Sequence, residues 1–297
     1  MRQVIEMRRP IKIIPRPIEA EARKAQPPDL SPEFREPPVD APLRFDDVEE
    51  QVSLINMALG SPSDLAVRRM SDGVVCLFLS PLVDQGAVRH SLVEPLSRAG
   101  WLELQEKSQA ARVLPVAGLS EARSLEAAVD RVAEGETALI VHGRPTPYTL
   151  DLKGRVARQV SPPISEPSVR GPRDSFTENL SDNLALVRQR IRSRDLRVRE
   201  LTVGLDTRTR VAVCYLEGRS SPEVVDAAIQ RLSAVTAPAV IDSSYLVPYL
   251  SKRTWSLFPP AAATERADRA CAAIVQGRIV VIRSEEHTSE LQSHHPI

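Results

Sequence analysis

The sequence has few residues of the kinds that build reactive centres. Its three cysteines, Cys76, Cys214 and Cys271, lie far apart and form no C-x-x-C pair, so we expect reduced, buried thiols rather than disulfides or a zinc site. The 39 basic side chains are balanced by 39 acidic ones. A chain without net charge has no overall field toward nucleic acid or an anionic membrane, and we therefore expect no nucleic-acid partner.

Long apolar runs are also missing. The longest, Val74–Val83, contains Pro81 and has ten residues, whereas a helix that spans a membrane needs about 20. The N-terminus carries basic residues but no apolar stretch of the signal-peptide type before its first prolines. From these absences we expect no membrane span in this chain and a cytosolic compartment.

Sequence motifs typical of enzymes are absent as well. The chain contains no G-x-G-x-x-G, Walker, G-x-S-x-G or H-E-x-x-H pattern, which would indicate nucleotide, nucleophile or zinc chemistry. Three of the five histidines lie within residues 287–297, which leaves His90 and His142, too few and too isolated for a histidine-ligated metal. We predict no catalytic residue, no metal site and no cofactor, and a protein that is not an enzyme.

Proline content and hydrophobic periodicity divide the chain into five parts. Residues 1–45 hold nine of the 25 prolines and are predicted to be a disordered arm, either a solvated leader or a docking segment for a partner. A first α/β subdomain (46–159) and a second (175–283) flank a proline-rich linker (160–174). Residues 284–297 resemble a translated sequencing adapter, so we expect a non-native tail and a truncated second subdomain.

The spacing of apolar residues predicts the secondary structure. The spacing of Val48, Val52, Ile55 and Leu59 predicts an amphipathic helix that ends at Gly60. Further predictions are strands at 74–79, 137–142 and 148–154 and helices at 85–99 and 120–134. The capping-box spacing of Ser175 and Glu178, followed by an apolar stripe that reaches Ile191, predicts that a helix begins near Ser175.

An internal repeat connects the two subdomains. The segment Asp64–Arg68 recurs as Asp195–Arg199, and each copy is followed by an apolar strand with a cysteine, two helices and a strand that opens with glycine. The repeat predicts two tandem, similar α/β subdomains with mixed sheets. In the first copy the strand at 137–142 turns and pairs with the next one. No such strand follows Ile282, so we expect the strand at 279–282 to lack this neighbour.

Arginines gather around the start of the second subdomain. Between Arg170 and Arg210 the chain has ten arginines and six acidic residues. On a continuous helix Arg188 would share a face with Arg192, as would Arg190 with Arg194. Because the cluster contains one aromatic residue and no known nucleic-acid module, we favour a structural role in which arginines contact linker carbonyls and neighbouring acids between the subdomains. The candidate residues are Arg170, Arg188, Arg190, Arg192, Arg194 and Arg199.

Several segments of the chain resemble a known family. They are Leu59–Met70, Glu166–Pro167, Arg170–Pro172, Leu186–Val198, Val240–Leu250 and Leu257–Asp268. Taken together they are similar to the N-terminal region of GerA-type spore germination proteins, the A subunits of nutrient germinant receptors. Ala267 stands where the family usually has proline, which is a small departure within one turn.

The resemblance implies a fold, a location and partners. It implies two units similar to transport substrate-binding proteins, on the cytoplasmic (spore core) side of the spore inner membrane. It also implies assembly with receptor B and C subunits, self-association, and ion release in response to nutrients. Two functions stay open: receptor assembly with signal transmission, or the sensing of an amino acid or sugar in the cleft between the units. The related stage V sporulation protein AF is a further alternative.

Overall fold

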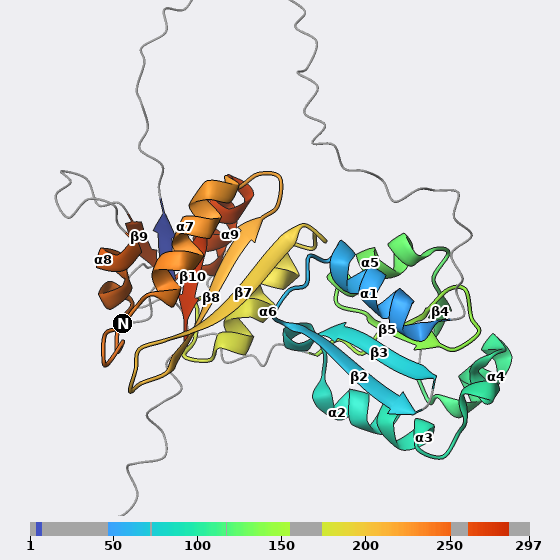
Figure 1. The fold of residues 1–297 in the computed structure, drawn as a ribbon. Coiled ribbons are helices and arrows are strands. Elements are labelled where there is room, and N and C mark those ends of the chain that lie inside the picture. Colours follow the sequence, from blue (N-terminus) through green and yellow to red (C-terminus); the bar gives the residue numbers. More distant parts are fainter. Residues whose placement is uncertain are drawn as a thin grey trace, which may run out of the picture. The chain divides into compact units, whose positions relative to one another are not determined.

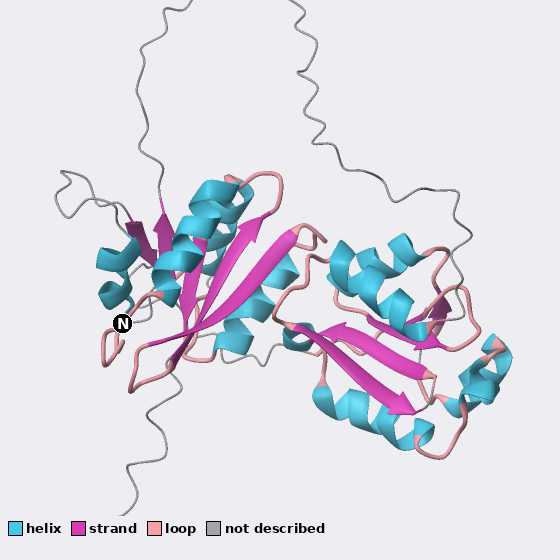
Figure 2. Ribbon diagram, viewed as in Figure 1, coloured by secondary structure: helices cyan, strands magenta, loops and turns pink. Residues whose placement is uncertain are grey.

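The computed structural model describes residues 4–7, 47–71, 73–116, 118–154, 174–250 and 261–284. They form two five-stranded sheets with helices packed against them (Figures 1 and 2). The predicted α/β class is confirmed. We call residues 47–154 the first half and residues 174–284, together with 4–7, the second half.

The first half contains the sheet β2-β3-β5-β6-β4. Its strands are β2 (Leu65–Ser71), β3 (Val74–Leu79), β4 (Ser120–Glu121), β5 (Thr137–Val141) and β6 (Tyr148–Leu150). Its helices are α1 (Val48–Ala58), η1 (Ser80–Leu82), α2 (Gln85–Val88), the π-helical η2 (Arg89–Val93), α3 (Glu94–Leu96), η3 (Trp101–Leu104), α4 (Lys107–Val113) and α5 (Leu125–Ala133). The predicted helix at 120–134 therefore begins later, at Leu125, because residues 120–121 pair with β6.

Strand β3 lies at the centre of this half and is buried at every position. Its residues alternate between two cores, since successive side chains of a strand point to opposite faces. Val75, Leu77 and Leu79 pack with α1 and α5, and Cys76 and Phe78 pack on the opposite face with α2 to α4. A strand covered on both faces needs apolar residues throughout, which explains the continuous run in the sequence.

The second half contains the sheet β7-β8-β10-β1-β9. Its strands are β1 (Val4–Met7), β7 (Leu196–Val203), β8 (Thr209–Leu216), β9 (Ala261–Thr264) and β10 (Val280–Arg283). Its helices are α6 (Leu180–Arg190), α7 (Pro222–Ser233), η4 (Ser243–Leu246), α8 (Val247–Leu250) and α9 (Ala267–Val275).

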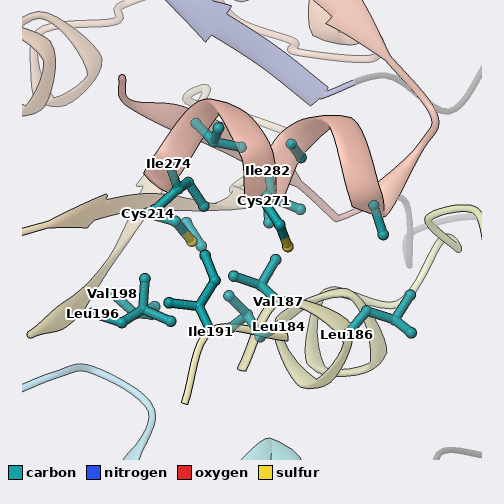
Figure 3. Close-up of a cluster of buried hydrophobic side chains, with 14 of the residues drawn as sticks. Leu184, Leu186, Val187, Ile191, Leu196, Val198, Cys214, Cys271, Ile274 and Ile282 are labelled. Carbon is teal, nitrogen blue, oxygen red and sulfur yellow. The ribbon is translucent and has the colours of Figure 1, made fainter. Parts of the chain in front are cut away.

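Helices α6 and α9 cover one face of this second sheet. Figure 3 shows Cys271 and Ile274 of α9 close to Val187 and Ile191, with Cys214 of β8 beside them. These side chains belong to one buried cluster. The opposite face of the sheet packs against α7 and α8, so both halves are three-layered.

The strand pairs of both sheets differ from the prediction of mixed sheets. Every pair among the described strands is antiparallel. A single crossover helix usually joins parallel neighbours. Here several helices and β4 separate β3 from β5, so the chain can reverse before it returns to the sheet.

The linker helix begins later than the capping-box spacing predicts. Asn179 is the N-cap of α6, and its side chain accepts a hydrogen bond from the Asp182 amide at 3.0 Å. Ser175 instead forms an isolated antiparallel bridge with Arg266, and the Phe176 amide donates to the Glu265 carbonyl. Because this tertiary pairing keeps the chain extended, Ser175 cannot act as the helix cap.

Strand β1 contradicts one expectation about the chain ends. Residues 4–7 belong to the predicted disordered arm, yet they form a strand between β10 and β9. No described strand follows β10 in the chain, and Val280 and Val281 instead pair with β1. A segment at the other end of the sequence satisfies the hydrogen-bonding groups that a local hairpin was expected to satisfy. The rest of the predicted arm, most of the linker and residues 285–297 lie outside the described residues.

The two sheets have the same strand order if β1 takes the place of β6. The repeated motif also keeps its register, since Leu65 pairs with Leu79 and Leu196 pairs with Leu216. The cysteines do not correspond, however. Cys76 pairs with Arg68, but Cys214 pairs one motif position earlier, with Val198, and a shift of one residue places a side chain on the other face. The duplication itself stays a prediction.

Candidate functional site

A buried ion pair joins the two halves. Arg188, in the last turn of α6, donates from Nε to Asp64 Oδ2 at 2.9 Å and from Nη2 to Asp64 Oδ1 at 2.8 Å. Both side chains are 1% exposed. The remaining terminal nitrogen donates to the Leu196 carbonyl at 3.1 Å. The guanidinium therefore binds the carboxylate through two parallel hydrogen bonds, the strongest geometry available to such a pair.

A pair in this environment is sensitive to the loss of either partner. Removing two charges from water is expensive, and their mutual attraction offsets that cost only when the geometry is good and the other hydrogen-bonding groups are satisfied. Arg188 meets both conditions, because it also binds the Leu196 carbonyl. Loss of either side chain would therefore leave the other charge buried and unpaired.

Hydrogen bonds between residues 61–63 and the outer edge of β7 extend this contact. We call these bonds, together with the Asp64–Arg188 pair, the joint. The Ser63 amide donates to the Val198 carbonyl at 3.0 Å, and the Glu200 amide donates to Ser63 Oγ at 3.0 Å. Arg199 donates to the Ser61 carbonyl at 3.1 Å. The segment between α1 and β2 thus covers hydrogen-bonding groups that an edge strand would otherwise expose.

Gly60 is required where this segment leaves α1. Its φ of +74° lies in the left-handed region, and a Cβ built on it would stand 2.3 Å from Cζ of Arg197. The Arg197 side chain donates to the carbonyls of Leu59 and, at 2.8 Å, of Arg194. Glycine adopts this backbone conformation without the strain that a side chain would bring, and a Cβ would also displace the flexible end of the Arg197 side chain.

The other candidate arginines on and after α6 each make separate contacts. Arg190 contacts Asp174 and donates to the Leu186 carbonyl at 3.3 Å. Arg192 donates from Nε to the Gln189 carbonyl at 3.2 Å, and Arg194 lies 3.9 Å from Asp130 of α5. The helix ends at Arg190, where the C-cap Ile191 has φ −114° and ψ 86°.

The predicted shared helix faces of Arg188 with Arg192 and of Arg190 with Arg194 are therefore wrong. The second residue of each pair lies beyond the last turn of α6. Arg170 lies outside the described residues.

Sequence reasoning did not identify Asp64, Ser63 and Arg197 as members of the joint. Asp64 stood out only as the first residue of the repeated motif. A usable signal was its position directly before β2, where the carboxylate is buried and therefore needs a partner. Nothing in the sequence indicates that this partner lies on α6, in the other half.

The three cysteines are poor nucleophiles. Burial raises the pKa of the Cys214 thiol, a change only partly opposed by the nearby Arg188 guanidinium. Burial also raises the pKa of Cys76 to about 12 and that of Cys271 to about 11. Since the thiolate is the reactive form, all three side chains act as small apolar residues of the cores.

No group of histidine, cysteine and acidic residues in the described part of the chain could hold a metal ion. No helix there has the length and apolar character that crossing a membrane requires.

Comparison with known proteins identifies relatives along most of the chain. The family model for the Bacillus/Clostridium GerA spore germination protein matches residues 53–288. The chain is 26% identical over 239 residues to "Uncharacterized membrane protein YfkQ" of Bacillus subtilis (strain 168), covering 79% of this chain and 47% of that protein. It is also 26% identical to two other proteins of that strain, Spore germination protein KA and Stage V sporulation protein AF. These matches cover 75% and 76% of this chain and 43% and 47% of those proteins.

A solved structure has the same fold. The N-terminal domain of the A subunit of the Bacillus megaterium spore germinant receptor GerK3 matches with a TM-score of 0.58 and 22% sequence identity, over 81% of this chain and 92% of that domain. The chain spans less than half the length of the three curated relatives described above. Because the family model covers most of its length, the chain belongs to the Bacillus/Clostridium GerA spore germination protein family.

Proposed function

We propose that this chain acts in nutrient-triggered spore germination as the N-terminal region of a germinant receptor A subunit, where it supports receptor assembly and transmits a signal between its two halves. Its family and the shared fold with the N-terminal domain of a receptor A subunit support this proposal. By the same resemblance its place is the cytoplasmic side of the spore inner membrane, with receptor B and C subunits and further copies of itself as partners.

The contacts between residues 61–64 and the second half are the observation that carries the proposal. A protein that closes two lobes around a ligand needs a hinge, a few residues that absorb the motion. The joint here includes the Asp64–Arg188 pair and hydrogen bonds from residues 61–63 to β7. Opening it would expose a desolvated ion pair, so a displacement of one half is passed to the other. This geometry favours transmission over the cleft-closing sensor.

The chemistry of the joint also favours a non-enzymatic role. The buried acid and base are held by each other, and neither points to a reacting group. The cysteine thiols have raised pKa values. These side chains supply neither a general base nor a nucleophile at neutral pH.

Complementation of spores tests the proposed function. All genes for GerA-family A subunits are removed from the source organism, and one receptor operon is restored either intact or with this gene deleted. We expect nutrients to trigger germination, measured as loss of optical density, only with the intact operon. Equal germination in both strains would overturn the proposal.

Calorimetry separates assembly from nutrient sensing. The full chain is titrated with a panel of amino acids and sugars, and its association is followed by analytical ultracentrifugation. We expect concentration-dependent association and no heat of binding. A saturable heat with one compound would instead support a sensing role for the region between the halves.

A further inference from the structure

The most unusual feature of the second sheet is the source of its fourth strand. In the first half, β6 follows β5 after a short turn and occupies the position between β5 and β4. In the second half the corresponding position, between β10 and β9, is taken by β1 from the N-terminus. Figure 1 shows this blue strand among the orange and red elements. The second half therefore has a place for a strand that its own continuous segment, residues 174–284, does not fill.

The place is shaped to receive an extended peptide. On one side Ile5 and Glu6 pair with Val281 and Val280 of β10, and on the other all four residues of β1 pair with β9. In the sheet, β9 pairs with no described strand except β1. Without a strand in this place, β10 and β9 would present unpaired main-chain groups to each other, which is the arrangement that accepts an added strand.

The floor of this site belongs to the two cores of the second half. The β10 residues Val280, Val281 and Ile282 are at most 1% exposed, and they belong to the two cores on either face of the sheet. Pairing with β8 holds β10 in register over Val280–Arg283. The accepting edge is thus fixed by the second half itself.

The chain length allows the strand of one copy to reach another copy. Residues 8–47 separate β1 from α1, and at 3.3–3.6 Å per residue this segment could span at most about 140 Å. A compact protein of this size has a radius of gyration of about 20 Å.

We propose that the position between β10 and β9 is a strand-acceptor site, and that copies of this protein associate by exchanging their N-terminal strands, residues 4–7. The bound ligand is an extended peptide held by main-chain hydrogen bonds. A tethered strand has an effective concentration in the millimolar range for its own site. Exchange therefore becomes favourable when copies are concentrated, as in a receptor assembly. Only the receptor setting rests on the proposed function. Strand exchange would stand even if the spore experiment failed.

A peptide in trans tests the acceptor site. A variant that lacks residues 1–9 is titrated with a fluorescent peptide of residues 1–9, and anisotropy reports binding. The matched control is the same peptide with Ile5→Pro, because proline lacks the amide that the ladder needs. We expect saturable one-to-one binding, weakened at least about tenfold by the proline, and slower amide exchange in β9 and β10 when the peptide is bound. Strand β8 serves as the internal folding control.

Association of the full chain tests exchange. We expect sedimentation to show dimers or larger species at high concentration for the full chain but not for the variant without residues 1–9. The proposal is overturned if neither peptide binds while β8 keeps its protection. It is also overturned if the peptide binds but both chains stay monomeric, because residues 4–7 would then serve only their own chain.

Discussion

Replacing Arg188 by methionine should destabilise the protein severely. The substitution removes two hydrogen bonds to Asp64 and one to the Leu196 carbonyl, and it leaves a carboxylate that is 1% exposed without its cation. Breaking a buried ion pair by removing one partner costs about 3–5 kcal/mol. Since a domain is stable by about 5–15 kcal/mol, R188M should lose a large fraction of the free energy of unfolding.

The double variant Asp64→Leu with Arg188→Met isolates the reason for this loss. It removes the unpaired charge and fills the space with apolar groups, so we expect it to be about 2 kcal/mol more stable than R188M alone. Arg192→Met is the matched control, because Arg192 is exposed and its side chain donates to the Gln189 carbonyl within the same half. Its effect should stay within about 0.5 kcal/mol.

Urea unfolding followed by far-UV circular dichroism measures all three variants. The fitted slope reports whether both halves still unfold together, since it scales with the surface exposed. A second, earlier transition in R188M would indicate that the halves have become uncoupled. The reasoning is refuted if R188M loses less than about 1 kcal/mol, or if the double variant is no more stable than R188M.

Three other predictions test features around the joint and the second core. Gly60→Ala should lower the free energy of unfolding by about 1–3 kcal/mol in chemical denaturation, because the φ of Gly60 is +74°. The control Gly100→Ala places its Cβ in open space and should change stability by less than about 0.5 kcal/mol. Equal effects of the two substitutions would contradict this account. Cys214 should react with a disulfide reagent at pH 8 only when urea unfolds the chain, since burial raises its pKa, and rapid labelling of the native protein would argue against burial. The hydrogen bond from Arg266 lowers the pKa of Asp268 in the folded protein. The Asp268 carboxylate therefore stabilises the fold at pH values above its ordinary pKa, and this stabilisation is lost as the pH falls through the lower pKa of the folded state. Unfolding free energies measured from about pH 5 to pH 2 should thus decline more for the wild type than for D268N, and parallel curves would exclude this coupling.

Local patterns in the sequence predicted several of the helices and strands. The apolar run at 74–79 coincides with β3, and the four-three-four spacing from Val48 coincides with α1. These predictions succeed because a strand buried on both faces and an amphipathic helix each leave a periodicity in the residues that form them. The family resemblance carried by residues 186–198 and the other quoted segments is confirmed by the family model.

Local signals failed where a distant segment offered a better hydrogen-bonding partner. Ser175 has the spacing of a helix cap, but its backbone pairs with Arg266, and the N-cap of α6 is Asn179 instead. Residues 4–7 lie in a proline-rich sequence typical of a disordered arm, but they form a strand that pairs with β10 and β9. In both cases the satisfaction of main-chain groups across the fold outweighs a weak local preference.

The sequence by itself therefore determined the family, the α/β class, the apolar cores and an arginine-rich region at the start of the second half. Only the tertiary structure decided which of those arginines matters. It paired Arg188 with Asp64, 124 positions away, and left Arg192 on the surface. The physical reason is that the periodicity of a segment fixes which face it buries, whereas the partner of a buried charge is set by desolvation and geometry when two distant segments meet.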